Sequence, residues 1–263
     1  MRSRNLAVVE TAGEDRRVQD RARAWRDGMH AAVCDVIEPW EHGTIVRSTR
    51  HPSYFDFNLV RVEDDRAITA TAVEAVAERA LAGLGHRRVS FDHLTNGEPL
   101  RAALEAGRWR AMRLLWLRHE GSLPPLPAGP KVVELPYDAV AHLRVTWHHE
   151  DFPGSDPTSF HREAREVALR RGAVLRAVVQ RGSPIGYAQL ERDGVAAEVT
   201  QVFVHPDHRG RGLGTALTGA AIRSAPDARD LWITADDEDR PKRLYTRLGF
   251  RPVWTALDFQ RVL

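Results

Sequence analysis

The sequence predicts an α/β protein of the α+β class, with two domains that each hold a central sheet flanked by helices. Apolar segments with the two-residue alternation of strands are interspersed with segments of helical spacing, especially after residue 130. The chain has 263 residues, more than the roughly 100 to 200 of a single domain, so two domains are expected. A hydrophobic content of 43% is sufficient for two buried cores.

A segment rich in proline and glycine separates the two halves of the chain. Gly121–Pro130 holds four prolines and two glycines, a composition that sustains neither a helix nor a central strand. We therefore expect an N-terminal domain over residues 1–122, a linker over 123–130 and a C-terminal domain over 131–263.

Strand and helix patterns alternate along the C-terminal half. Arg181–Pro184 is typical of a hairpin turn between two β-rich segments. Ser159 or Thr158 is the N-cap candidate of a helix that Gly172 stops. In chain order we expect a strand at 131–135, helices at 137–148 and 159–171, strands at 173–180 and 185–191, a strand, a glycine-rich corner and a helix within 195–221, a strand at 231–234, a helix around Tyr245 and a last strand at 252–261.

Three segments of the N-terminal half echo this order. Arg88–Phe91 and Met112–Arg118 have strand patterns, and Pro99–Ala106 between them has helical spacing. A glycine and an aromatic residue follow that helix, as they also follow the helix around Tyr245. The echo suggests that the two halves arose by duplication.

Val195–Ala221 combines an apolar strand, a short turn and a glycine-rich corner that opens a helix. Such a corner favours a phosphorylated cofactor, because glycines let backbone N–H groups surround an anion at the positive end of a helix. Two familiar spacings do not fit it. A dinucleotide fingerprint begun at Gly210 or Gly212 meets Thr215 or Leu217 where a small residue is needed, and the Gly-Lys pair of a P-loop is missing.

The spacing that does fit is Arg-x-x-Gly-x-Gly, formed by Arg209, Gly212 and Gly214 after His205-Pro206-Asp207. It resembles the acyl-coenzyme A site of the GNAT superfamily of N-acyltransferases. A second motif, Leu244–Phe250, is similar to the closing helix and strand of that family. The resemblance implies a mixed, mostly antiparallel central sheet, and acetyl-coenzyme A (acetyl-CoA) as the acyl donor.

The resemblance also assigns cofactor contacts to two segments. Backbone N–H groups at the start of the helix would hold the pyrophosphate, and the strand before it would offer backbone groups to the pantetheine arm. The two arginines of the loop either reach phosphate oxygens or stay solvated. We expect a bulky residue at Gly212 or Gly214 to abolish binding, because a Cβ there would occupy phosphate space. The cofactor-binding candidates are Val202, Phe203, Val204, Arg209, Gly210, Arg211, Gly212, Leu213, Gly214 and Thr215.

Two residues are catalytic candidates by the same resemblance. Acetyl transfer requires a neutral amine, whereas an amine with a pKa of about 10.4 is protonated at pH 7. Glu198 lies eleven residues before Arg209, where relatives with a glutamate base carry it, and partial desolvation suits a carboxylate to that task. Tyr245 stands where many relatives place a hydroxyl that protonates the departing thiolate. The alternatives are a solvated glutamate on a strand face and a buried structural tyrosine.

Two polar clusters receive no cofactor role. Where many relatives carry a cofactor-contacting asparagine, this chain has Glu238 within the acidic run 236–239. That run either caps the next helix, with Pro241 in its first turn, or attracts a cationic amine. His148–Asp156 is expected to form a solvated polar loop at the acceptor site rather than a metal site, since adjacent loop side chains seldom converge on one ion.

The N-terminal half has no Arg-x-x-Gly-x-Gly motif, and no tyrosine lies in the helix before Gly107. We expect either a degenerate GNAT-like domain that has lost cofactor binding and serves packing or substrate selection, or an unrelated domain. The first interpretation gives a tandem arrangement with one catalytic domain.

Charge and composition limit the partners. The formal net charge of +2 steers neither anionic nor cationic acceptors. Lys131 and Lys242 are the only lysines and no basic and aromatic stripe recurs, so nucleic acid is not expected. No apolar run of about 18 residues or signal-peptide pattern occurs, so we expect a cytoplasmic protein without a membrane segment. The single cysteine, Cys34, is expected to be a buried small hydrophobe.

These features predict an N-acetyltransferase that moves the acetyl group of acetyl-CoA to a primary amine, of a small molecule, by direct attack in a ternary complex. No cysteine lies near the motifs to carry the acyl group covalently. The alternatives are a coenzyme A-binding regulatory module without catalysis, a transferase with a longer acyl donor, and a protein amine as acceptor. A monomer and a homodimer are both compatible with the sequence.

Overall fold

The computed structural model describes residues 2–123, 125, 129–238 and 241–263, with side chains from residue 13 onward. The chain forms two compact units. The N-terminal unit combines Met1–Trp116 with Pro252–Leu263, and the C-terminal unit comprises Leu117–Arg251. None of the helices in the described ranges is long and apolar enough to cross a membrane.

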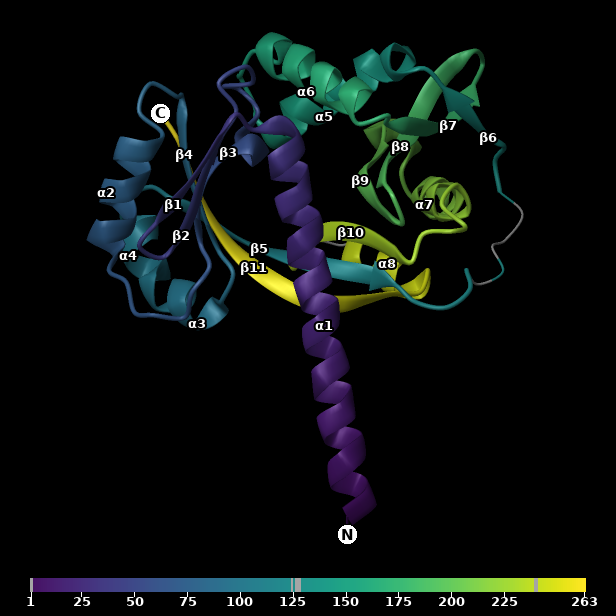
Figure 1. Cartoon of the computed structure of the whole chain (residues 1–263). Helices are drawn as coiled ribbons and strands as arrows, with labels where there is room; N and C mark the ends of the chain where they lie inside the picture. The colour runs from purple at the N-terminus through teal and green to yellow at the C-terminus, as the bar shows by residue number, and fades with distance from the viewer. Residues whose placement is uncertain (1, 124, 126–128, 239–240) are drawn as a thin grey trace. The chain divides into compact units, whose positions relative to one another are not determined.

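In the N-terminal unit the strands lie in the order β1-β2-β3-β4-β11. The β3–β4 pair is parallel and the other pairs are antiparallel. Helix α2 joins the two parallel strands and packs against both (Figure 1). The elements are α1 (Arg2–Val33), β1 (Val36–Trp40), β2 (Gly43–Arg47), β3 (Asn58–Val62), α2 (Ala70–Ala80), β4 (His86–Phe91), α3 (Leu94–Gly97), α4 (Arg101–Ala106), β5 (Arg110–His119) and β11 (Phe250–Val262), with short 3-10 turns at Phe55–Phe57 and Glu98–Leu100.

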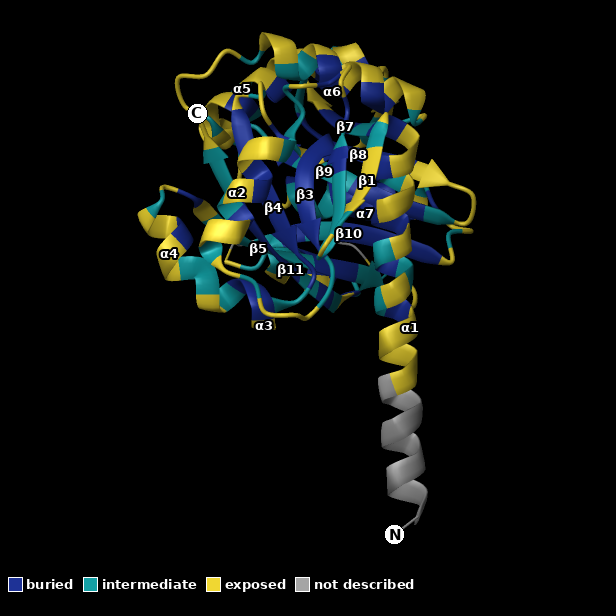
Figure 2. Cartoon of the chain, turned by 60° about the vertical axis from the view of Figure 1, so that its left-hand side comes forward, coloured by how far each residue is buried: buried dark blue, intermediate teal, exposed yellow. Residues whose placement is uncertain are grey.

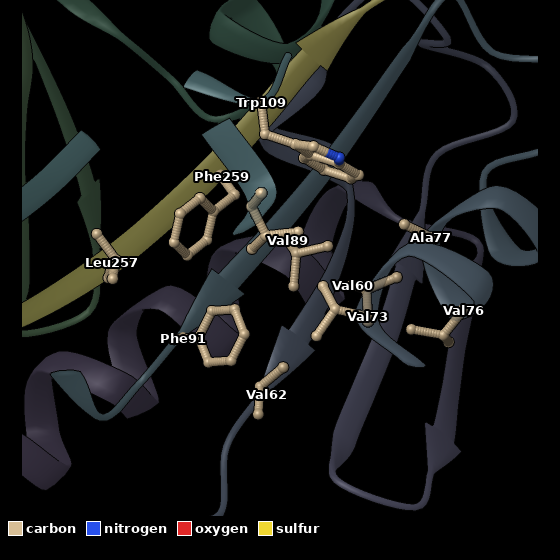
Figure 3. Packing of buried hydrophobic residues seen from close by; sticks show 11 residues of the cluster. Val60, Val62, Val73, Val76, Ala77, Val89, Phe91, Trp109, Leu257 and Phe259 are labelled. Atoms are coloured by element: carbon tan, nitrogen blue, oxygen red, sulfur yellow. The ribbon is translucent and has the colours of Figure 1, made fainter. Parts of the chain in front are cut away.

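A valine-rich core lies between α2 and this sheet (Figure 3). Val60 and Val62 of β3 are fully buried, as is Val73 of α2. The rings of Phe91 in β4 and Phe259 in β11 meet edge to face, with 5.8 Å between their centroids. Burial of each such side chain contributes about 1.5–3 kcal/mol, so the cluster holds the end of β11 against β4.

In the C-terminal unit the strands lie in the order β10-β9-β8-β7-β6. The β9–β10 pair is parallel and is joined through α7, whereas the other pairs are antiparallel. The elements are β6 (Val132–Leu135), α5 (Ala141–Asp151), α6 (Thr158–Arg170), β7 (Val174–Gln180), β8 (Ser183–Asp193), β9 (Ala196–Val204), α7 (Leu213–Arg223), β10 (Asp230–Asp236) and α8 (Pro241–Arg247), with 3-10 turns at Tyr137–Val140 and Pro206–His208.

The two faces of the C-terminal sheet are covered by different helices. A Cβ on Gly186 of β8 would lie 3.1 Å from Leu217 of α7. The next residue, Tyr187, belongs to a core cluster with Val140 and Leu143 at the start of α5. Because successive strand residues point to opposite faces, α5 covers the face opposite α7. Figure 2 shows the strands largely buried and the helices exposed on their outer sides.

The predicted fold class and most predicted elements are confirmed. The hairpin after β7 turns at Arg181 and Gly182 with φ of +50° and +83°, the left-handed pair that a two-residue hairpin favours. The prediction of a polar loop over 148–156 is wrong in its first half, because α5 continues to Asp151. The helix continues since the His148 ring is buried and packs against Phe160, with 5.5 Å between centroids.

The predicted last strand is present, but it pairs outside its expected domain. Leu257–Val262 pairs with His86–Phe91, so residues 252–263 belong to the N-terminal unit rather than to a domain over 131–263. The end of β5 was expected in the N-terminal domain, but the residues from Leu117 onward belong to the C-terminal unit. Residues 124 and 126–128 of the expected linker lie outside the described part of the chain.

Both units repeat one order of elements, in line with the predicted echo. In the N-terminal unit, antiparallel β1, β2 and β3 are followed by α2 and a strand parallel to β3. In the C-terminal unit, antiparallel β7, β8 and β9 are followed by α7 and a strand parallel to β9. The echo seen in short sequence segments therefore extends to the topology of the sheets.

Gly186→Ala should lower the free energy of unfolding of the C-terminal unit by about 1–3 kcal/mol. Its Cβ would lie 2.9 Å from Phe203 O and 3.1 Å from Leu217 Cδ1, so α7 would have to move off the sheet. Gly28→Ala is the matched control, since its Cβ meets open space within α1 and alanine favours helix by about 0.5–1 kcal/mol. Urea unfolding followed by circular dichroism measures both, and an unchanged midpoint for Gly186→Ala would contradict the close packing of α7 on β8.

Candidate functional site

The glycine-rich loop between β9 and α7 has a left-handed backbone at two places. Gly210 has φ of +76° and Gly212, the N-cap of α7, has φ of +75°. Side chains other than glycine rarely adopt this conformation. The turn places the first backbone N–H groups of α7, which have no partner within the helix, at the surface of the loop. This arrangement suits an anion.

The protein surroundings of these glycines differ. No protein atom lies within 4 Å of a Cβ built at Gly210 or Gly212, so within the protein itself their left-handed backbone is what favours glycine. A Cβ at Gly214 would lie 3.3 Å from Leu244 Cδ1 of α8. Gly214 therefore allows α7 to approach α8 closely, and this contact brings the two sequence motifs together.

The two loop arginines are hydrogen-bonded within the protein. Arg209 donates from Nε to Val204 O at 3.0 Å and from Nη2 to Glu150 Oε2 at 2.6 Å. Its guanidinium also lies 5.6 Å from the centroid of the Phe203 ring. Arg211 donates to Asp207 O at 3.1 Å. Arg209 thus ties the loop to the end of β9 and to α5, a role that the motif alone did not indicate.

β9 and β10 separate next to this loop (Figure 1). Their parallel register ends at Val199 and Ile233, although β9 continues to Val204 and β10 to Asp236. On its other edge β9 stays paired with β8 as far as Val204. The backbone of the candidate segment Val202–Val204 therefore has one edge in the sheet and one edge facing the gap between the strands. An extended ligand can bind such an edge by main-chain hydrogen bonds.

A β-bulge in β9 determines which way Glu198 points. Gln201 lies opposite Gln189 and Val199 lies opposite Leu190, so Thr200 is an extra residue. An extra residue reverses the alternation of side chains beyond it. Glu198 therefore lies on the same face as Gln201, the face covered by α5, although an uninterrupted strand would place it toward α7.

Glu198 is buried, with 4% of its surface exposed. The alternative of a solvated glutamate on a strand face is therefore wrong. Glu198 lies directly opposite Glu191 of β8 and beside Trp232 of β10. Glu191 forms a buried ion pair with Arg171 at the end of α6. Two buried carboxylates thus share one face of the sheet beneath α5 and α6.

A buried polar layer continues from this pair toward α5. Arg144 of α5 donates from Nη1 to Gln201 Oε1 and from Nη2 to Gln189 Oε1, both at 2.7 Å. Its guanidinium lies between two rings, 4.0 Å from the centroid of Tyr137 and 4.8 Å from that of Tyr187. Burial raises the pKa of both tyrosines, which keeps their hydroxyls protonated. Within the described chain, neither of these buried hydroxyls has a hydrogen-bond partner.

Little in the sequence indicates this layer. Its members come from α5, β8 and β9 and are separated by 45 and 57 residues along the chain. The available signal was the alternation of polar Gln189 and Glu191 with apolar residues in the strand expected at 185–191. Buried polar groups without partners are uncommon in proteins, so this layer is a candidate region for a polar acceptor.

The histidines of α5 and α6 form a mostly aromatic cluster. His148 Nε2 lies 2.7 Å from Ser155 Oγ, and burial lowers the pKa of the imidazole. His161 packs 5.5 Å from His148, and burial lowers its pKa to about 4. Among the residues that the structure describes, no group of three or more His, Cys, Asp or Glu side chains could hold a metal ion.

Tyr245 lies in α8, 7% exposed, and its ring is 6.1 Å from that of Phe250. It follows Leu244, the residue that packs beside Gly214, so Tyr245 comes directly after the contact of the two motifs.

The acidic residues before α8 form hydrogen bonds and an ion pair with neighbouring residues of the chain. Asp236 accepts from the backbone N of Glu238 at 3.0 Å, and Asp237 pairs with Lys242 at 2.7 Å.

The comparisons with known proteins agree with the motifs. Residues 141–250 match the family described as "Acetyltransferase (GNAT) family". This match includes both motifs and both catalytic candidates. The resemblance inferred from the two motifs is thus confirmed.

Curated relatives with the name mycothiol acetyltransferase include a protein of Frankia casuarinae and one of Actinosynnema mirum. The protein of Frankia casuarinae is 44% identical over 89 residues, which are 32% of this chain and 25% of the relative. That of Actinosynnema mirum is 32% identical over 170 residues, 59% of this chain and 56% of the relative. The chain therefore spans from a quarter to little more than half of these relatives.

The fold is also similar to that of a solved structure. A GCN5-related N-acetyltransferase from Kribbella flavida superposes with a TM-score of 0.58 at 18% identity, covering 91% of this chain and 94% of that chain. At this identity the likeness concerns the fold alone.

His161 should make stability depend on pH. Its pKa is about 4 when folded and about 6.5 in an unfolded chain, so the unfolded state binds more protons between these values. The free energy of unfolding should therefore fall as pH drops from about 6.5 to 4. His161→Phe should reduce this slope relative to the wild type. Urea unfolding across this range tests the prediction, and equal slopes in the variant and the wild type would contradict it.

Proposed function

Residues 141–250 form an acetyltransferase domain of the GNAT family, and from this premise we propose that the protein transfers the acetyl group of acetyl-CoA to a primary amine. The observation that carries the proposal is the gap between β9 and β10 beside the left-handed glycine loop. The gap offers main-chain groups to an extended arm, and the loop offers N–H groups to a diphosphate at one end of it.

The residues present fit this donor. Backbone N–H groups of Gly210–Thr215 would hold the pyrophosphate, and Val202–Val204 would bind the pantetheine arm along the free edge of β9. The contact of Gly214 with Leu244 would fix the reacting end relative to α8. When bound, the thioester supplies an activated acyl group.

Glu198 is proposed as the base that takes the proton from the acceptor ammonium. An amine with a pKa of about 10.4 must lose a proton before it can attack a carbonyl carbon. A carboxylate in a buried site is a stronger base than one in water. Its position one residue before the last pair of β9 and β10, Val199 and Ile233, supports this role, because the gap opens directly after that pair.

Tyr245 is proposed as the acid. In a direct attack the C–N bond forms as the C–S bond breaks, and the sulfur takes up a proton that a phenol can donate. The position of Tyr245 beside the Gly214–Leu244 contact supports this assignment. A covalent route has less support, because Cys34 lies in the other unit and burial raises the pKa of its thiol to about 12.

The acceptor is proposed to be a small molecule. The polar layer around Arg144 and the paired carboxylates provides buried hydrogen-bonding groups on the face that Glu198 occupies. Relatives named mycothiol acetyltransferase, matched over a quarter to about half of their length, favour a small-molecule acceptor over a protein lysine.

The N-terminal unit is proposed to be a degenerate copy of the same fold. Its β3–α2 connection, in the place of the glycine loop, carries Glu63, Asp64 and Asp65 in place of glycines. Thr69 caps α2 by accepting a hydrogen bond from the backbone N of Ala72 at 3.2 Å. A capped helix start beside three carboxylates is unsuited to a diphosphate.

Glu198→Gln should lower kcat by about 10²- to 10⁴-fold, since an amide cannot accept the ammonium proton. The affinity for coenzyme A should remain within about twofold, because Glu198 does not belong to the phosphate loop. Thiol release with a panel of amines measures the rate, and calorimetry measures the affinity. An unchanged rate across pH 6 to 9 would exclude Glu198 as the base.

Tyr245→Phe should reduce kcat by roughly 10²-fold or more while preserving the fold, because the ring remains and only the hydroxyl is lost. The loss should be smallest with acyl donors whose thiol leaving groups are more acidic. Tyr54→Phe is the matched control, since this tyrosine belongs to the N-terminal unit, where its ring packs against Phe57. Equal rates for Tyr245→Phe and the wild type would reduce Tyr245 to a packing residue.

A further inference from the structure

Glu191 of β8 and Glu198 of β9 are directly opposite each other in the antiparallel register. Both residues are buried, with 5% and 4% of their surfaces exposed. The Cβ atoms of such opposed residues are about 4.5–5.5 Å apart, and like charges at this distance destabilise a sheet. Both side chains leave the sheet on the face covered by α5, so the two carboxylates share one buried region. The charge of one therefore affects how strongly the other holds a proton.

Glu191 accepts a hydrogen bond at each of its carboxylate oxygens. Arg171, at the end of α6, donates from Nε to Oε2, and Gln189 donates from Nε2 to Oε1 at 2.9 Å. The amide of Gln189 cannot be reversed, because its oxygen accepts from Arg144 and a guanidinium group has no acceptor. Two donors, one of them charged, favour the ionised form of Glu191.

This anion is poorly screened by water, because the side chains of Arg171 and Glu191 are each only 6% exposed. When two carboxylates share a buried site, the charge of one opposes the ionisation of the other. Since hydrogen bonds hold Glu191 as the anion, its charge increases the proton affinity of Glu198. The positive charge of Arg171 acts in the opposite direction and limits the increase.

Other ionisable side chains on this face are paired or uncharged. Asp230 of β10 is buried and lies 3.7 Å from Arg118, and Glu163 of α6 lies 3.8 Å from Arg162. Arg144 bonds to amides two to three positions further along the strands. Burial raises the pKa of two tyrosines and lowers the pKa of two histidines, which keeps all four uncharged near pH 7: Tyr137, Tyr187, His148 and His161. Glu191 is thus the charged group directly opposite Glu198.

We propose that Glu191 is a positioning residue for the acetyl transfer, whose anion, held by Arg171 and Gln189, makes Glu198 a base strong enough to work near neutral pH. The proposal rests on the proposed function, in which Glu198 is the base. The proton passes from the acceptor ammonium to the Glu198 carboxylate, which frees the nitrogen lone pair for the attack. Glu191 stays ionised throughout and exchanges no proton. A base whose proton affinity matches the working pH transfers protons most efficiently.

The pH dependence of kcat/KM for thiol release, with one amine as acceptor, tests the proposal. The quantity to compare is the acid midpoint, the pH at which kcat/KM reaches half its maximum on the acid side. Glu191→Gln keeps the side-chain shape and removes the negative charge, so the acid midpoint should fall by about one pH unit. Arg171→Gln removes the positive charge and should raise it by about one unit. The acceptor's own titration is the same in every assay.

Glu134→Gln is the matched control. Glu134 of β6 pairs with Arg176 at 2.9 Å, and their neighbours Leu135 and Leu175 belong to the core beneath α5. The pair therefore lies on the opposite face of the sheet from Glu191. Removing the same charge there should leave the acid midpoint unchanged.

Arg171→Lys separates charge from packing. It keeps the positive charge, so its acid midpoint should return toward that of the wild type even if Arg171→Gln lowers stability. Opposite shifts in Glu191→Gln and Arg171→Gln support the proposal, because loss of a structural ion pair would affect both variants alike. A lower rate in Glu191→Gln without a change of midpoint, or shifts in the same direction in both variants, would overturn it. Failure of the proposed function is distinguishable, since Glu198→Gln would then react at the wild-type rate.

Discussion

The left-handed turn at Gly210 and Gly212 is the constraint from which the rest of the candidate site follows. It directs the chain from the end of β9 into α7 within a few residues, which leaves the start of the helix at the end of the strand. The crossover then returns the chain in β10, parallel to β9. Once the strands separate at Val199 and Ile233, the free edge of β9 and the start of α7 lie at the same end of the sheet. One short segment, from the end of β9 to the start of α7, therefore offers main-chain groups both to a phosphate and to an extended ligand.

The two units share one order of strands and helices, but this shared topology does not by itself create an anion site. Both place a helix between two parallel strands after an antiparallel set. In the C-terminal unit the helix starts at Gly212, whose backbone leaves the N–H groups open, whereas in the N-terminal unit Thr69 caps the helix. Carboxylates such as Glu63 precede that second helix and bond to arginine. The difference lies in a few residues of one turn, while the sheet around it is retained.

Local sequence signals predicted the loop, the strand before it and the helix around Tyr245, because glycine spacing and apolar alternation act over a few residues. They did not predict the pairing of Leu257–Val262 with β4, because that contact depends on cores assembled from distant segments. The long α1 helix was missed for a different reason. Its charged residues do not leave a clear apolar stripe, and its mean hydropathy is low. The close approach of Gly214 to Leu244 was also not predicted, because it depends on how α7 and α8 pack against each other.

The buried layer around Arg144 explains why Glu198 faces α5 rather than α7. Arg144 bonds at once to Gln189 and Gln201, which are the opposed pair at the edge of the β9 bulge. Both bonds can form only while the two amides remain opposite each other, so Arg144 holds the register on one side of Thr200. The pairing of Glu191 with Arg171 lies on the other side of the bulge. A slip of one residue between these points would turn Glu198 toward α7, away from Glu191 and away from the polar layer. The hydrogen bonds of Arg144 thus determine the direction of the Glu198 side chain, although Arg144 is not among the residues proposed to bind acetyl-CoA.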